Sequence, residues 1–197
     1  CSGSGVFLVA AARRFKALGV EDWPRRVYGC DIDPVAAHVT RLSLLLELGE
    51  PFAFEPQVVC GDGLRLDTLT ALPVGEFDVV LSNPPWGAKL SQATASTNVA
   101  TGSASSSEDS FAAFIEIGFR ALKTRGLMSY LLPDSVFTTR HHHATRRRLL
   151  QHNIREIHLL GHLFPGLLTE VARIDLSKEP QKSSGISVSK HSKNARG

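Results

Sequence analysis

The chain has 197 residues, of which 43% are hydrophobic and 21% are charged, a balance typical of one globular domain with a substantial core. Its formal charge of +3 permits a polyanionic partner without requiring one. The longest apolar runs are far shorter than the roughly 20 residues that cross a bilayer, and three cysteines without metal-ligand spacing indicate free thiols in a reducing compartment. We therefore expect a cytoplasmic protein with neither a membrane segment nor a metal site.

A glycine-rich turn opens the chain and leads into a helix. Gly3 and Gly5 would let the backbone pass close to a cofactor, and the N-terminus of the helix would present free N–H groups to it. The helix is expected to continue through Leu18 and to stop at Gly19. A short Gly-x-Gly is weak evidence by itself, because a plain loop before a helix is the more frequent meaning of the pattern.

The next stretch, residues 27 to 34, predicts a short strand with an acidic residue at its end. An acidic residue at the end of the second strand of a doubly wound sheet is placed to bind a ribose diol, and Asp31 is the candidate. Asp33, followed by Pro34, is expected instead to cap a helix that runs to Leu48.

A second short strand, residues 56 to 60, also ends in a carboxylate. Asp62 lies between Gly61 and Gly63 and could accept a hydrogen bond from the amino group of a cofactor adenine. The alternative is a simple Asp-Gly turn. Because open α/β sheets bind ligands at the carboxyl ends of their strands, the repetition of the pattern supports each assignment.

The strand at residues 77 to 80 leads into Asn83-Pro84-Pro85-Trp86, which suits methyl transfer to an exocyclic amino group. An adenine amino nitrogen is a poor nucleophile, and two acceptors on its N–H groups would free its lone pair. The Asn83 side chain and the Pro84 carbonyl could be those acceptors, on a turn that the prolines stiffen. Trp86 offers a face for a flipped base. The alternative is a strand-ending turn beside a core tryptophan.

The middle of the chain combines a polar loop, a core helix and a basic helix. Residues 87 to 110 are expected to form a flexible loop that either closes over a substrate or is an ordinary insertion. A core helix to residue 122, a turn at 123 to 126 and a strand at 127 to 132 follow.

The helix predicted at 139 to 152 carries Arg146, Arg147 and Arg148, which could bind phosphates; a solvated face is the alternative. Three consecutive histidines before them point in different directions, which argues against a metal site.

The last part of the chain predicts strands at residues 154 to 160 and 171 to 176, with Phe164 in the loop between them. Phe164 could be a second aromatic facing a flipped base, or a core residue. The segment 177 to 197 is rich in Lys, Ser and Gly and is expected to be a disordered tail.

Together these stretches resemble the gamma-class amino-group DNA methyltransferases, the adenine-N6 enzymes of restriction-modification systems. The stretches that follow the order of that family are Cys1-Ser2-Gly3-Ser4-Gly5-Val6-Phe7, Gly29-Cys30-Asp31-Ile32-Asp33-Pro34, Gly61-Asp62-Gly63, Asn83-Pro84-Pro85-Trp86, Leu131-Leu132-Pro133-Asp134-Ser135 and Leu163-Phe164-Pro165. Trp86 stands where Tyr or Phe is commoner in the family.

The resemblance implies a doubly wound, Rossmann-like class I α/β sheet over residues 1 to 176 and S-adenosylmethionine as cofactor. It implies that the catalytic turn also borders the cofactor at Asn83 and that Phe164 stacks on the flipped base. The implied cofactor residues are Gly3, Gly5, Asp31 on the ribose, Ile32 on the adenine, Asp62, Gly63 and Asn83. The family's first strand would precede Cys1, so we expect a catalytic-domain fragment that lacks it and has exposed strand edges.

The leading hypothesis is a prokaryotic enzyme that methylates the N6 amino group of an adenine flipped out of DNA, alone or with a restriction or specificity subunit. The same fold acting on an RNA base or a protein glutamine is one alternative. A truncated remnant that binds nucleic acid without catalysis is another.

Overall fold

A computed structural model describes residues 1–49, 54–65, 68, 70–87, 110–166, 168–181 and 185–190. The chain forms two compact units, whose described residues lie within Cys1–Pro73 and from Val74 onward. That residues 1 to 176 make one catalytic domain stays a prediction. Most of the predicted loop at 87 to 110 lies outside the described residues. Each unit is described by itself below.

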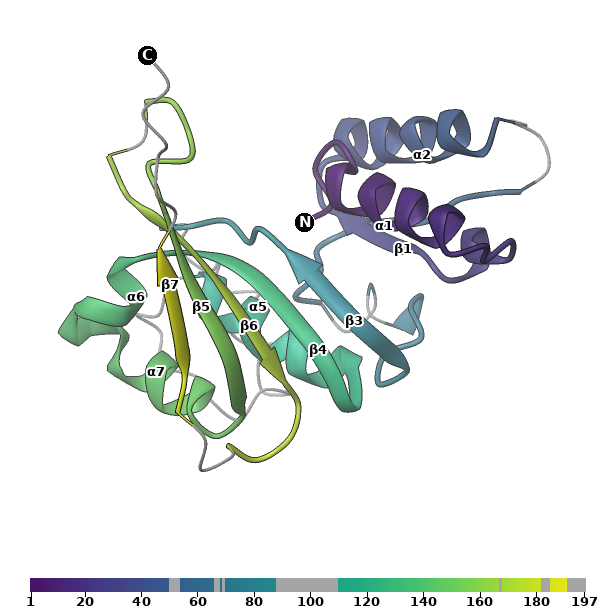
Figure 1. Cartoon of the computed structure of the whole chain (residues 1–197). Coiled ribbons are helices and arrows are strands. Elements are labelled where there is room, and N and C mark those ends of the chain that lie inside the picture. The colour runs from purple at the N-terminus through teal and green to yellow at the C-terminus, as the bar shows by residue number, and fades with distance from the viewer. Residues whose placement is uncertain are drawn as a thin grey trace, which may run out of the picture. The chain divides into compact units, whose positions relative to one another are not determined.

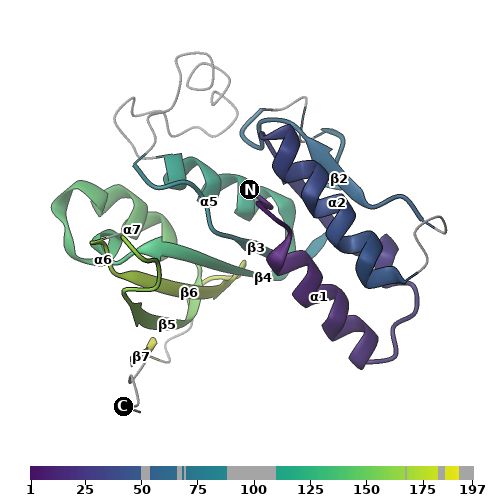
Figure 2. The ribbon, with the colours of Figure 1, turned by 90° about the horizontal axis from the view of Figure 1, so that it is seen from above.

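The first unit joins two helices to a parallel pair of strands. Its elements are α1 (Val6–Ala17), η1 (Trp23–Arg25), β1 (Tyr28–Asp31), α2 (Pro34–Leu48) and β2 (Gln57–Cys60). Strand β1 pairs with β2 so that Asp31 lies opposite Cys60, and α1 lies beside α2 (Figure 2). The buried core between helices and strands consists of Ala12, Trp23, Val27, Ala37, Leu44 and Val58.

Local sequence determines where the helices of the first unit begin and end. Gly5 precedes α1 with φ 83°, a backbone conformation that favours glycine, and Gly49 ends α2 with φ 79°. Asp33 caps α2, because its side chain accepts a hydrogen bond from the Val35 N–H at 2.9 Å, and Pro34 occupies the first helical position. The predicted cap at Asp33 is therefore confirmed.

In its described residues, the second unit is a five-stranded sheet with helices on one face (Figure 1). Its elements are β3 (Phe77–Ser82), α5 (Ser110–Ala121), β4 (Leu122–Pro133), α6 (Ser135–Thr138), η3 (Arg140–His142), α7 (His143–Leu149), β5 (Asn153–Gly161), β6 (Val171–Ser177) and β7 (Ser187–Lys190). The strand order is β3-β4-β6-β5-β7. Strand β6 runs antiparallel to both of its neighbours, β4 and β5. The two outer strands are parallel to their neighbours: β3 to β4, and β7 to β5.

The core of the second unit lies between the sheet and helix α5. Phe111, Ile115 and Phe119 recur at helical spacing and face Met128 and Tyr130 of β4. The predicted core helix is thus confirmed. The other face of the sheet carries a half-buried polar ladder, whose hydrogen-bonded or ion-paired members are Ser129, Asp175, Arg173, Glu156, Ser189 and His158.

Two predicted boundaries differ from the structure. The turn expected at residues 123 to 126 lies within the bounds of β4, but the pairing with β3 passes from Leu122 directly to Leu127 and Arg125 has a φ of 67°, so the chain turns there. The helix expected at 139 to 152 is shorter and begins with the 3-10 turn η3. The tail expected to be disordered contains β7, which pairs with β5. In each case pairing with a distant strand or packing against the core outweighs local propensity.

The described strands leave edges without a partner strand. Among the described residues, β1 pairs only with β2, and β3 pairs only with β4. Val79 and Leu81 of β3 remain 50% and 41% exposed. Across the described residues, every helix is too short or too polar to span a bilayer.

Candidate active site

Asp31 ties the glycine-rich turn to the end of β1. Its Oδ2 atom accepts a hydrogen bond from the Gly3 N–H at 2.8 Å, and its Oδ1 atom accepts one from the Asp33 N–H at 3.1 Å. A carboxylate offers about four acceptor positions, so these two bonds leave others available to a ligand hydroxyl. The side chain is partly exposed. Its geometry suits the ribose role that the sequence predicts.

The glycine turn also depends on a residue that the sequence did not single out. Thr40, fully buried on α2, donates a hydrogen bond from Oγ1 to the Gly3 carbonyl at 2.9 Å. A Cβ atom added at Gly5 would lie 3.1 Å from the Thr40 side chain, and Gly5 has a positive φ. Only a residue without a side chain fits there. The turn therefore passes close to α2, and the N–H groups of Ser2, Gly3 and Gly5 are all bonded within the protein.

Ile32 and Asp62 flank the same end of the parallel pair. Ile32 is 67% exposed, although it is a large apolar residue directly after a strand. Asp62 follows β2, and its side chain accepts a hydrogen bond from the Leu64 N–H at 3.0 Å. This bond makes an Asx-turn with Gly63 as its middle residue. An exposed apolar side chain beside two carboxylates fits a nucleoside, whose ribose hydroxyls and adenine face need these partners.

The catalytic turn predicted at Asn83 follows β3 in the second unit. Asn83 is half-buried, Pro84 is fully buried and Pro85 is exposed. Two distant groups hold the turn: Ser110 Oγ donates to the Pro85 carbonyl at 2.7 Å, and Trp86 Nε1 donates to the Leu131 carbonyl at 3.3 Å. Neither contact could be recognised from the sequence, because the partners are 25 and 45 residues away.

The two aromatic residues predicted to stack on a base lie near each other. The ring centroids of Trp86 and Phe164 are 6.0 Å apart, and the rings make an angle of 63°, an edge-to-face arrangement. A planar base lies parallel to any ring on which it stacks, so one of the two rings must turn before both can stack on the same base. Phe164 is followed by Gly166, whose positive φ shapes the loop after β5.

The three arginines predicted to bind phosphates have different surroundings. Arg146 donates from Nη1 to the Val136 and Thr139 carbonyls at 2.8 and 2.6 Å, which ties α7 to α6. A guanidinium has five N–H donors, so part of its capacity is used inside the protein.

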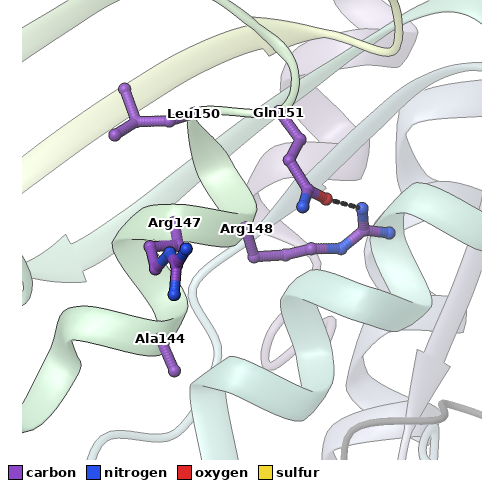
Figure 3. Close-up of a pocket in the computed structure, with 5 residues that line it drawn as sticks. All are labelled: Ala144, Arg147, Arg148, Leu150 and Gln151. Atoms are coloured by element: carbon purple, nitrogen blue, oxygen red, sulfur yellow. Dashed lines mark hydrogen bonds between the residues drawn. The ribbon is translucent and has the colours of Figure 1, made fainter.

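Arg148 is held more firmly than Arg147. Both oxygens of Glu116 accept from Arg148 at 2.5 and 3.1 Å, the Gln151 side chain accepts at 2.6 Å, and the guanidinium lies 5.1 Å from the centre of the Phe119 ring. Arg147 is exposed and, among the described residues, has no ion pair or hydrogen bond. Figure 3 shows both arginines and Gln151 around a shallow hollow at the end of α7.

Cysteine and metal chemistry have little support in the described part of the chain. Burial raises the pKa of the Cys30 thiol, and the carboxylates of Asp31 and Asp62 raise it further, although the amino terminus opposes them. A thiol with a raised pKa is a poor nucleophile at neutral pH. Within the described ranges, no group of three His, Cys, Asp or Glu side chains is arranged to hold a metal ion.

Most of the chain superimposes on methyltransferase structures. A proposed class I S-adenosylmethionine-dependent methyltransferase from Listeria monocytogenes matches with a TM-score of 0.74 and 21% identity over 96% of this chain and 56% of that chain. The M protein of the type I restriction enzyme EcoKI matches with a TM-score of 0.68 and 19% identity over 90% of this chain and 38% of its own. The fold is therefore that of the class I methyltransferases, as the sequence predicts.

The chain belongs to the Eco57I restriction-modification methylase family, whose model matches residues 25–163. It is also 32% identical over 206 residues to the type II methyltransferase M.VspI of Vibrio sp. (strain 343). That alignment covers 98% of this chain and 45% of the relative, so the chain spans less than half the length of this relative. The predicted resemblance to restriction-modification methyltransferases is confirmed.

Proposed function

We propose that the protein transfers a methyl group from S-adenosylmethionine to the N6 amino group of an adenine flipped out of DNA. The observation that carries the proposal is the turn at Asn83, where a half-buried amide directly precedes a fully buried proline. Family membership and the M.VspI relative support the reaction class.

The residues of the first unit fit S-adenosylmethionine. The carboxylate of Asp31 suits the ribose hydroxyls, the exposed side chain of Ile32 suits one face of the adenine, and Asp62 with Gly63 suits its amino edge. Gly3 and Gly5 let the backbone approach the rest of the molecule. When bound, this cofactor supplies an activated methyl group.

The catalytic residues act through hydrogen bonds and position. Oxygens of Asn83 and Pro84 would accept both N–H groups of the adenine, so that the nitrogen lone pair turns away from the ring and toward the methyl group. Trp86 and Phe164 would stack on the extruded base, which otherwise loses its neighbours in the duplex. No covalent enzyme intermediate is required.

DNA is the proposed partner of the second unit. Arg147 would bind a backbone phosphate, since its charge is exposed at the hollow of Figure 3, and Arg146 and Arg148 would add to the local positive potential. Two structural relatives were determined as complexes with DNA, DrdV and LlaBIII. A restriction or specificity subunit is a further proposed partner, because one structural relative comes from the complex assembly of a type I restriction-modification system.

The test uses the full-length protein with S-adenosylmethionine and unmethylated DNA, followed by digestion to nucleosides and mass spectrometry. N6-methyladenine should form, and Asn83→Ala should lower its rate by about 100- to 1,000-fold while cofactor binding stays largely intact. Asp78→Ala on the same strand is the matched control, because the Asp78 side chain is 83% exposed. Normal methylation by Asn83→Ala would refute the assignment.

A further inference from the structure

Ser110, the first residue of α5, lies against the catalytic turn. Its Oγ atom donates a hydrogen bond to the Pro85 carbonyl at 2.7 Å, and the residue is 4% exposed. We propose that Ser110 is a positioning residue for methyl transfer, which orients the acceptors of Asn83 and Pro84 without touching the base. This inference rests on the proposed function.

The turn needs a donor from elsewhere because it contains two prolines. Pro84 and Pro85 have fixed φ angles but no N–H groups, so they cannot close a backbone hydrogen bond within the turn. Their ψ angles stay free, and ψ of Pro85 sets the plane of the next peptide. The bond from Ser110 fixes that plane on one side, and the bond from Trp86 Nε1 to the Leu131 carbonyl at 3.3 Å fixes it on the other.

The bond from Ser110 also gives the two proline carbonyls different roles: the Pro85 carbonyl accepts from Ser110, and the Pro84 carbonyl does not. Because the Pro85 carbonyl is engaged by Ser110, the preceding carbonyl, that of Pro84, is the one left for a substrate amino group together with Asn83. A displacement of about 1 Å at such a site costs on the order of 100-fold in rate. Loss of the tether should therefore appear in turnover.

Capping of α5 is the ordinary role of a serine at this place. A capping hydroxyl accepts a hydrogen bond from an N–H of its own helix, and its loss destabilises the helix. The Ser110 hydroxyl instead donates out of α5 to an exposed residue, Pro85. Water can replace that donor after truncation, so stability should change little while the turn loses its fixed orientation.

The experiment compares Ser110→Ala, Ser110→Thr and the control Ser129→Ala in the full-length protein. Ser129 is half-buried on the opposite face of the sheet, where its hydroxyl donates to Asp175 at 2.5 Å. Steady-state methylation gives kcat and KM, and denaturant unfolding gives stability. Acrylamide quenching of tryptophan fluorescence, measured on the 197-residue chain, reports on Trp86, because the other tryptophan of these residues, Trp23, is 4% exposed and poorly quenched.

We expect Ser110→Ala to lower kcat by about 10- to 100-fold with little change in KM and to increase quenching of Trp86. Ser110→Thr keeps a hydroxyl and should retain kcat within a few-fold, and Ser129→Ala should keep both kcat and quenching. Unchanged kcat and quenching in Ser110→Ala would overturn the proposal, as would an equal loss of kcat in Ser129→Ala. If the wild type makes no N6-methyladenine, the proposed function fails, whereas the quenching comparison still decides whether Ser110 holds the turn.

Discussion

The candidate site residues of the first unit and those of the second unit are held in different ways. In the first unit, the Asp31 side chain accepts hydrogen bonds from the N–H groups of Gly3 and Asp33. These bonds tie the end of the strand to the backbone of the two turns beside it. In the second unit, the catalytic turn is held by Ser110 and by the Leu131 carbonyl, which belong to a helix and a strand far along the chain. Substitutions should therefore affect ligand affinity in the first unit and packing or turnover in the second.

The largest effect on stability is expected from Gly118→Ala, which tests the packing behind the catalytic turn. A Cβ atom at Gly118 would lie 2.5 Å from the Tyr130 hydroxyl oxygen and 2.7 Å from the Met128 sulfur, both buried. Displacing Tyr130 would also break its hydrogen bond to the Phe114 carbonyl, at 3.1 Å. The free energy of unfolding should fall by about 2 to 3 kcal/mol in urea denaturation.

The matched control for this change is Gly185→Ala. A Cβ atom there meets nothing within 4 Å, and Gly185 has no positive φ. Its free energy of unfolding should stay within about 0.5 kcal/mol of the wild type. If Gly118→Ala behaved like this control, the close packing of α5 on β4 would be wrong.

Asp31→Ala tests the first unit at the level of ligand affinity. The variant loses a charged acceptor for the ribose and the bond that orders the glycine turn, so calorimetry should show S-adenosylmethionine binding about 10- to 100-fold more weakly. Asp33→Ala is the control, because Asp33 caps α2. It should cost about 1 kcal/mol of stability and leave affinity unchanged. Equal affinities for wild type and Asp31→Ala would remove Asp31 from the site.

A smaller effect is expected from the ion pair between Arg148 and Glu116, which joins α7 to α5. The two side chains are 36% and 14% exposed and form two hydrogen bonds. A double-mutant cycle to alanine should give a coupling energy of about 1 kcal/mol. The pair of Lys123 with Asp78, at 43% and 83% exposed, is the comparison and should give less than about 0.5 kcal/mol. Equal couplings would show that Arg148 is not held in place.

The smallest predicted effect is a pH dependence at His152, which stacks on Phe119 with ring centroids 3.8 Å apart. Burial lowers the pKa of His152, and the charges of Arg148 and Lys178 lower it further, whereas Glu116 opposes them. The unfolded chain, with a histidine pKa of about 6.5, therefore binds the proton more readily than the folded one.

This contribution to stability is complete above about pH 6.5 and is lost as the pH falls toward the lower pKa of the folded state. Unfolding curves measured between about pH 8 and pH 5, the range in which histidine titrates, should show the free energy of unfolding of the wild type falling with pH. The His152→Gln variant should lack the part of this fall that comes from His152. An identical pH profile in the variant would assign the decline to other groups.

The sequence by itself determined the features that depend on a few adjacent residues. Asp33 with Pro34 specifies a helix start, Gly49 specifies a helix end, and the strand before Asn83 specifies where the catalytic turn begins. These are local effects of side-chain hydrogen bonding and backbone freedom, so they can be read from spacing alone. The order of such stretches also identified the methyltransferase family.

Tertiary structure alone decided which distant groups support those turns. Phe164 and Trp86 were expected on one base, and the structure places their rings edge to face. Ser110 and the differing surroundings of Arg146, Arg147 and Arg148 had no sequence signal, because each depends on the packing of α5 and α7 against the sheet. Strand β7 emerged from a polar tail for the same reason: pairing with β5 supplies hydrogen bonds that its own sequence does not encode.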